Sequence, residues 1–262
     1  MLNIFKLERR YTVFDDKTYS KLLKTIKTMT TYTLEEPVKK DLTDYYFDNS
    51  KNLLDENELL LRKRVCGSKA ELKIKRKYFN PQYFYTDNLR SHEREKEINA
   101  YDSLSKHYFF LNNALNSMFS NNLQFDPDKL FEQMVVYLTI KIKQETRTLF
   151  GYGGLKVEVK RERLKIYNKR TKRKAKSEII QFKLLSAERT LPLFEDLITR
   201  VERHCKELFY TKDSKHEIAI KITKPLPSKE ERKKMKEEML RQKALEESGE
   251  VSPDKIQKKE EK

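Results

Sequence analysis

The sequence has little of what builds a disulfide framework, a metal cluster or a membrane span. Its two cysteines, Cys66 and Cys205, are isolated, and its four histidines show no ligand spacing, so neither a disulfide framework nor a zinc site is expected. No stretch approaches about 18 consecutive apolar residues, and the first residues lack the apolar core of a signal peptide. We therefore expect no membrane span and an intracellular protein, cytoplasmic or nuclear, with a mitochondrial location left open.

Charge, in contrast, is abundant and unbalanced. Lys and Arg number 57 against 41 Asp and Glu, a formal net charge of +16. Residues 224–262 hold 12 of the basic and 10 of the acidic residues, so the surplus lies almost entirely in the preceding part of the chain. We predict a folded domain over 1–224 and a charged helical or disordered tail over 225–262, with a single helix at about 228–246. A basic domain of this kind indicates polyanionic partners: phosphates, nucleic acid or an acidic membrane surface.

Apolar residues alternate with polar ones along much of the domain, which predicts an α+β fold with a large antiparallel sheet. Strands are expected at 5–14, 42–49, 58–65, 69–79, 91–98, 137–150, 155–168, 177–186 and within 212–222, although a helix start fits 91–98 nearly as well. Helical spacing predicts helices at 15–29, 102–119, 126–139 and 191–210, with a helical insertion at about 100–138.

Two of these strands each align same-sign charges on one face. Residues two apart in a strand face the same side, so "LLLRKRV" puts Arg62 beside Arg64, and "AELKIKRKY" puts Lys73 beside Lys75. Such neighbours repel one another in a sheet. A barrel that closes around the charges and binds an anion makes them tolerable, because unpaired buried charge is costly. Plain surface residues, or lysines protecting an edge strand, are the alternatives.

The order of motifs along the chain is similar to that of a known superfamily. "KLERRYTV", "YYFDN", "LLLRKRV", "AELKIKRKY", "EREKEI", "TRTLF", "EIIQFKLL" and "DSKHEI" follow one another between residues 6 and 218. This set resembles the triphosphate tunnel metalloenzymes, which include CYTH domains, polyphosphate polymerase domains of the VTC type and the RNA triphosphatases of mRNA capping. The resemblance implies an eight-stranded antiparallel barrel whose basic tunnel binds a triphosphate or polyphosphate and whose carboxylates hold Mg²⁺ or Mn²⁺.

Carried over by position, the resemblance implies specific site residues. Glu8, Lys75 and Lys215, the last from a Ser-Lys pair with Ser214, would be catalytic, and Glu8 with Glu158 would hold the metal. The substrate would be bound by Lys6, Arg10, Arg62, Arg64, Lys73, Lys75, Arg94, Arg147 and Lys183. A structural ion pair is the alternative for Glu8, and pairing with Glu145 is the alternative for Arg147.

The chain also departs from the superfamily's pattern. Lys6 stands where the first glutamate of the opening motif is expected, and the late acidic strand reads Ile179, Gln181 and Lys183, closer to the Glu-x-Lys of polyphosphate polymerases. A shift of one residue would instead turn Glu178 inward. We expect hydrolysis of an inorganic, nucleoside or organic triphosphate with a divalent metal. The alternatives are an inactive tunnel protein that binds polyphosphate or RNA, and a relative of polyphosphate polymerases or RNA 5′-triphosphatases.

One further motif is the cationic stretch "KRTKRKAK" at 169–176, between two predicted strands. It fits a nuclear localisation signal or a nucleic-acid contact, and a solvated hairpin tip is the simpler alternative. The sequence leaves these open.

Overall fold

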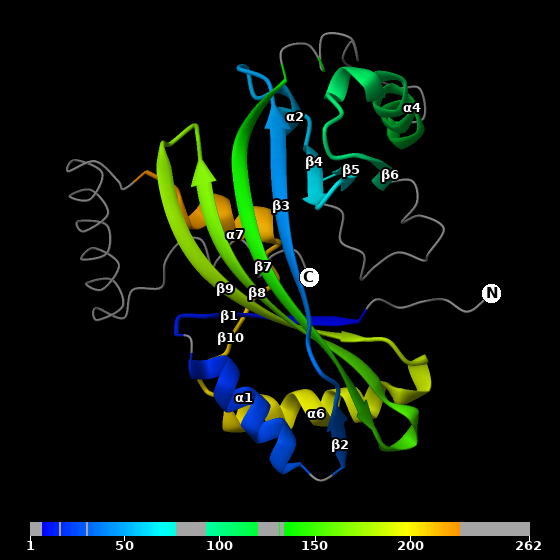
Figure 1. The fold of residues 1–262 in the computed structure, drawn as a ribbon, viewed down its shortest axis with the longest axis vertical. Coiled ribbons are helices and arrows are strands. Elements are labelled where there is room, and N and C mark those ends of the chain that lie inside the picture. Colours follow the sequence, from blue (N-terminus) through cyan, green and yellow to red (C-terminus); the bar gives the residue numbers. More distant parts are fainter. Residues whose placement is uncertain are drawn as a thin grey trace, which may run out of the picture. The chain divides into compact units, whose positions relative to one another are not determined.

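One antiparallel sheet organises the protein (Figure 1). The computed structural model describes residues 7–15, 17–29, 31–76, 93–119, 131 and 134–225. Residues 1–223 form one unit, to which everything below refers, and 224–262 form another. The helix predicted at about 228–246 lies outside the described residues.

The sheet has ten strands in the order β10-β1-β9-β8-β7-β3-β4-β5-β6, with β2 paired to β7 beside this path. The strands are β1 (Glu8–Val13), β2 (Tyr32–Leu34), β3 (Val38–Asp48), β4 (Leu59–Cys66), β5 (Lys69–Arg76), β6 (Glu93–Asn99), β7 (Val135–Gly151), β8 (Lys156–Asn168), β9 (Arg173–Leu184) and β10 (Phe209–Tyr210). Within the described residues no pairing joins β6 to β10, so the sheet is open. The predicted eight-stranded barrel is therefore matched only approximately.

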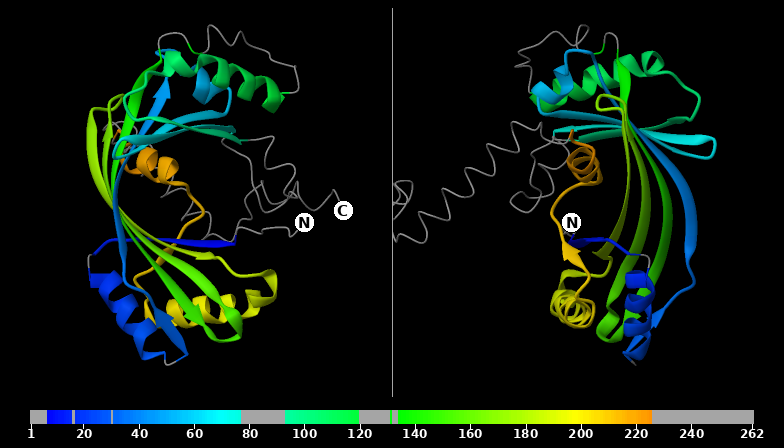
Figure 2. Two further views of the ribbon diagram at one scale, coloured as in Figure 1. Left: turned by 45° about the vertical axis from the view of Figure 1, so that its right-hand side comes forward. Right: turned by 90° about the vertical axis from the view of Figure 1, so that its left-hand side faces the viewer.

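Helices lie on both faces of the sheet. They are α1 (Lys17–Thr28), α2 (Leu53–Glu56), α4 (Tyr108–Phe119), α6 (Leu191–His204) and α7 (Lys215–Ile222), with short 3₁₀ turns at Leu104–His107, Tyr152–Gly154 and Glu188–Thr190. One face of β1, β9 and β8 packs against α1 and α6, and the same face of β4, β5 and β6 packs against α4. We call this the outer face. The opposite, inner face packs against α7 through Ile218 and Ala219, and Figure 2 shows the long strands curving around that helix.

Two predicted elements were wrong. The predicted strand at the end of 212–222 is the helix α7, because Ser214 and Glu217 form a reciprocal capping box and Ile218 and Ala219 are buried on one side of the helix. The predicted helix over 126–139 does not extend to its expected end, since β7 begins at Val135. Leu138, Ile140 and Ile142 are all buried on the inner face, which is period two and not helical spacing.

Other boundaries follow local sequence signals. The β4–β5 hairpin turns at Gly67, whose φ of +61° favours glycine, as its place between two strands predicted. Residues 93–99 form strand β6, which settles the alternative of a helix start. The helix expected over 191–210 ends at His204, after which Phe209 and Tyr210 pair with β1.

Candidate anion site on the inner face

The strand register decides which side chains reach the inner face, because directly paired residues point to the same side. Across β1, β9, β8 and β7 the register forms three inner-face rows: Glu8–Lys183–Glu158–Thr148, Arg10–Gln181–Lys160–Thr146 and Thr12–Ile179–Glu162–Gln144. Across β3, β4 and β5 it aligns Asp44 with Arg64 and Glu71, and Tyr46 with Arg62 and Lys73. The observed register therefore has Gln181 and Lys183 on the inner face and Glu178 on the outer one.

Arg64 forms the best-defined contact of this face. Its Nε and Nη2 each donate a 2.7 Å hydrogen bond to Asp44, whose side chain is completely buried. Burial alone would raise the pKa of Asp44, but the hydrogen bond and charge of Arg64, with Arg62 and Lys215 adding to them, hold that pKa below its usual value. The bidentate pair fixes the plane of the guanidinium and leaves Nη1 free of Asp44.

Arg62 lies two residues earlier on the same strand and is less completely satisfied. Its Nη2 donates to Glu71, yet its Nε is buried and has no hydrogen-bond partner among the described residues. A buried donor without an acceptor costs free energy. This N–H could donate a hydrogen bond to an acceptor atom that the described part of the chain does not supply.

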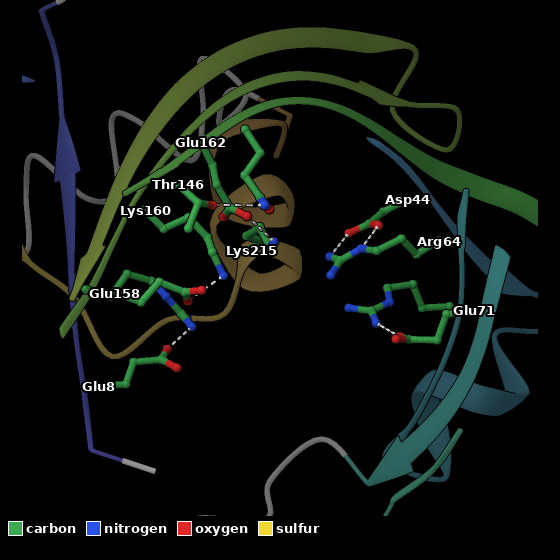
Figure 3. Close-up of polar contacts among 12 residues, drawn as sticks. Glu8, Asp44, Arg64, Glu71, Thr146, Glu158, Lys160, Glu162 and Lys215 are labelled. Carbon is green, nitrogen blue, oxygen red and sulfur yellow. Dashed lines mark hydrogen bonds and ion pairs between the residues drawn. The ribbon is translucent and has the colours of Figure 1, made fainter. Parts of the chain in front are cut away.

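Lys215 lies opposite Arg64 on this face, as Figure 3 shows. It is the first residue of α7, and its Nζ donates a 2.8 Å hydrogen bond to Glu162, which is 2% exposed. Burial lowers the pKa of Lys215, Glu162 opposes this, and the charge of Arg64 lowers the pKa further. Lys215 and Arg64 are thus close enough for each cation to disfavour the other.

Lys73 and Lys75 extend the cluster along β5. The Nζ of Lys73 lies 3.0 Å from both Glu93 and Glu95. Lys75 is half-buried and has no ion pair among the described residues. Burial lowers the pKa of Lys75; Glu93 opposes this, whereas Lys73 and Arg62 lower the pKa further. An anion bound near Lys75 would stabilise the charged form of this lysine.

The first two rows alternate cations and carboxylates. Arg10 donates to Glu8 and also, at 2.5 Å, to the carbonyl of Asp213, and the Nζ of Lys160 lies 2.9 Å from Glu158. Glu8 therefore forms an ion pair, which was one alternative for it. Lys183 stands between Glu8 and Glu158 in their row.

These carboxylates do not fit a divalent metal site. Mg²⁺ and Mn²⁺ need several oxygen ligands around one point. In the described ranges no three Asp, Glu, His or Cys side chains gather in a way that could hold a metal. Glu8 and Glu158, the predicted ligands, are each bound to a cation of the chain, and the ammonium-bearing Lys183 separates them in the row. Lys6 lies outside the described residues.

Two predicted site residues lie apart from this cluster. Arg94 pairs with Ile74, which is buried in the outer-face core under α4, and it donates to the carbonyl of Glu93. Arg147 pairs with Val159, also buried on the outer face, and its Nε donates to Glu145 at 3.0 Å. The register therefore places both arginines on the other side of the sheet from Arg62 and Lys215.

Some inner-face residues were missed from the sequence. Asp44 lies two residues before Tyr46 in "LTDYYFDN", and Lys160 lies between Glu158 and Glu162 in "VEVKRE". Strand alternation alone would have put each on the same face as these neighbours. Only the three-dimensional pairing, however, reveals that Asp44 is the partner of Arg64.

Several solved structures are similar to this chain over most of its length, but their sequence identity with it is low. A Hippeastrum protein named as a candidate adenylyl cyclase with a dominant triphosphatase activity is 14% identical, covering 85% of this chain and 98% of its own, with a TM-score of 0.46. A candidate adenylate cyclase from Bacillus halodurans is 12% identical, covering 82% and 97%, with a TM-score of 0.46. The Mimivirus capping enzyme triphosphatase is 7% identical, covering 74% and 87%, with a TM-score of 0.32.

The sequence matches no protein-family model and no curated protein at a significant level. Because the structural likenesses are this distant, the assignment of function rests on the residues of the inner face. No helix in the described part of the chain is long and apolar enough to cross a membrane.

Proposed function

We propose that the inner face binds a triphosphate-type anion, either inorganic triphosphate or the triphosphate group of a nucleotide or another organic molecule. The observation that carries the proposal is the buried Nε of Arg62, a donor with no acceptor among the described residues. Arg62 lies two residues before Arg64, which Figure 3 shows opposite Lys215. A phosphate oxygen would accept from that N–H, and arginine forks bind phosphate oxygens in this geometry.

Internal carboxylates explain how the face stays folded without a ligand. Asp44, Glu71 and Glu162 each neutralise one cation of the cluster, so most of the repulsion is removed before an anion arrives. Donors remain on Arg62, on the Nη1 of Arg64, which Asp44 does not use, and on the lysine ammonium groups, each of which has three N–H bonds. An incoming triphosphate would use these remaining donors and leave the carboxylate pairs in place.

Hydrolysis of the anion stays a prediction. The sequence led us to expect a divalent metal at Glu8 and Glu158, but each of these carboxylates forms an ion pair with a cation of the chain, Glu8 with Arg10 and Glu158 with Lys160. Binding, in contrast, needs only the donors already on the inner face. These residues support a receptor for a triphosphate-type anion best. This is close to one alternative that the sequence left open, an inactive tunnel protein that binds polyphosphate or RNA.

The test compares two arginines of the same sheet, one from β4 and one from β6, the two strands that pair with β5. By isothermal calorimetry, Arg62→Ala should weaken tripolyphosphate binding by about 10- to 100-fold, the range for losing charged hydrogen bonds. Arg94→Ala, the matched control on the outer face, should leave the affinity close to that of the unaltered protein. Equal effects of the two substitutions would refute the inner-face site, provided that both variants melt like the unaltered protein.

A further inference from the structure

A second cluster of cations lies on the outer face, away from the proposed triphosphate site. It occupies the middle of β7, β8 and β9, which no described helix covers in Figure 1, where α7 lies behind these strands. Its exposed members are Lys141, Lys143, Arg163, Lys165, Lys174 and Lys176, which we call the outer basic face. The last two belong to the "KRTKRKAK" stretch, whose function the sequence left open.

Like charges lie directly opposite one another on this surface. Lys141 pairs with Lys165, which pairs in turn with Lys176, and in the next row Lys143 pairs with Arg163. Directly opposed like charges destabilise a sheet. In the described part of the chain none of the outer basic face has a carboxylate ion-pair partner. The acids in these rows are Asp41, across from Lys143, and the buried Glu178, which lies across from Arg163 but is bound by Arg161.

The next row shows that this lack of neutralisation is local. One row nearer to α1, Arg161 donates two 2.8 Å hydrogen bonds to Glu178. On the outer face, the cation that lies next to the helices, Arg161, is therefore neutralised by a carboxylate. The cations of the exposed rows have no such ion pair in the described part of the chain. A repulsive arrangement of this kind indicates a surface stabilised by an external polyanion.

Aromatic rings border the cations. A hollow of about 770 Å³ lies against this surface. Its walls include Phe14, the five cations Lys141, Lys143, Arg163, Lys165 and Lys176, and three acids, Asp15, Asp41 and Glu178. The Phe14 side chain is 84% exposed. Tyr167, also exposed, pairs with Lys174, whose Nζ lies 5.9 Å from the centre of the tyrosine ring. Exposed rings beside a basic surface are the two features that bind unpaired bases and their phosphates.

We propose that the outer basic face binds single-stranded nucleic acid, with phosphates on the lysine and arginine rows and bases against Phe14 and Tyr167. This site is separate from the inner face and goes beyond the triphosphate binding proposed there. Unpaired bases fit the exposed rings, which a duplex would leave without a stacking partner. Insertion into a membrane would need a broad apolar patch, and the vesicle measurement below tests that alternative.

The experiment measures fluorescence anisotropy of a labelled 15-nucleotide single strand with two charge-matched triple variants of the full chain. Lys141→Glu with Lys165→Glu and Lys176→Glu should reduce affinity at least tenfold and reduce the slope of log affinity against log salt by about 2. The control, Lys24→Glu with Lys27→Glu and Lys206→Glu, makes the same change in net charge at exposed positions elsewhere and should reduce affinity far less. Equal losses in both triples would overturn the proposal.

Two further measurements separate this site from its alternatives. Tyr167→Ala should weaken binding about fivefold or more, the effect of losing one stacked base, while Arg62→Ala should leave it unchanged. Displacement of the oligonucleotide by saturating tripolyphosphate would place it on the inner face and overturn the proposal. Tighter binding to phosphatidylserine vesicles than to the oligonucleotide, lost in the first triple variant, would also overturn it in favour of a membrane surface.

Discussion

Removing Arg64 should destabilise the protein strongly, because it leaves the Asp44 carboxylate buried without its partner. Asp44 has no exposed surface and both of its oxygens accept from Arg64 at 2.7 Å. Breaking a buried ion pair from one side costs about 3–5 kcal/mol. For a domain of this size that corresponds to a fall in melting temperature of about 6–20 °C. Thermal unfolding of Arg64→Ala at pH 7, followed by circular dichroism, measures it.

The pH dependence identifies the cause of that loss. Because the pKa of Asp44 lies below its usual value, the stabilisation from the pair is present above the pKa of the unfolded carboxyl and is lost as pH falls through the lower, folded pKa. Without Arg64, burial should raise the pKa of Asp44, so the variant's deficit should shrink as the pH is lowered from 7 towards 4. Asp44→Asn in the Arg64→Ala background should recover part of the stability at pH 7.

Lys21→Ala provides the matched control, since it removes a cation whose partner, Glu207, is exposed. It should change the melting temperature little. If Arg64→Ala melts like this control, or if its deficit is the same at pH 7 and pH 4, the carboxylate of Asp44 is not the buried charge that the structure implies.

Two further predictions concern the lysines of the inner face. Lys215→Met should lower both stability and tripolyphosphate affinity. Adding Glu162→Gln should restore stability alone, because the buried carboxylate is then gone while the ammonium group is still missing. Calorimetry and melting curves of the single and double variants separate the two effects, and recovery of affinity in the double variant would contradict the role of Lys215. Burial lowers the pKa of Lys75 and Lys215, so tripolyphosphate affinity should be full below those pKa values and fall as pH rises through them, earlier than for an ordinary lysine. Binding measured from pH 7 to 10 checks this, and Lys75→Arg should move the loss to higher pH; an affinity that is flat over this range would speak against bound ammonium groups.

Much of the sheet was predictable from local pattern. Strand alternation located β1, β4, β5, β8 and β9 and indicated that Arg62 and Arg64 share a face. The register of β9 was a choice between two faces, and the pairing of Gln181 with Arg10 decides it. Period two carries this information because the side chains of a strand alternate strictly between faces.

What the sequence did not provide depends on contacts between distant segments. "SKHEIAIKI" has enough β-branched residues for a strand, but the capping box and the burial of Ile218 against the inner face make it helix α7. The same packing brings Lys215 opposite Arg64, a pairing that no spacing along the chain reveals. Arg94 and Arg147 match motifs by position, yet their strands turn them outward.

The central claim is that the inner face binds a triphosphate through its own donors, without a metal ion held by the protein. Calorimetry of the unaltered protein with tripolyphosphate in EDTA and in Mn²⁺, followed by an assay for released phosphate, tests it most directly. The structure predicts binding in EDTA comparable to that in Mn²⁺. Binding that appears only with Mn²⁺ and is followed by phosphate release would contradict the claim, because Glu8 and Glu158 would then build a working metal site.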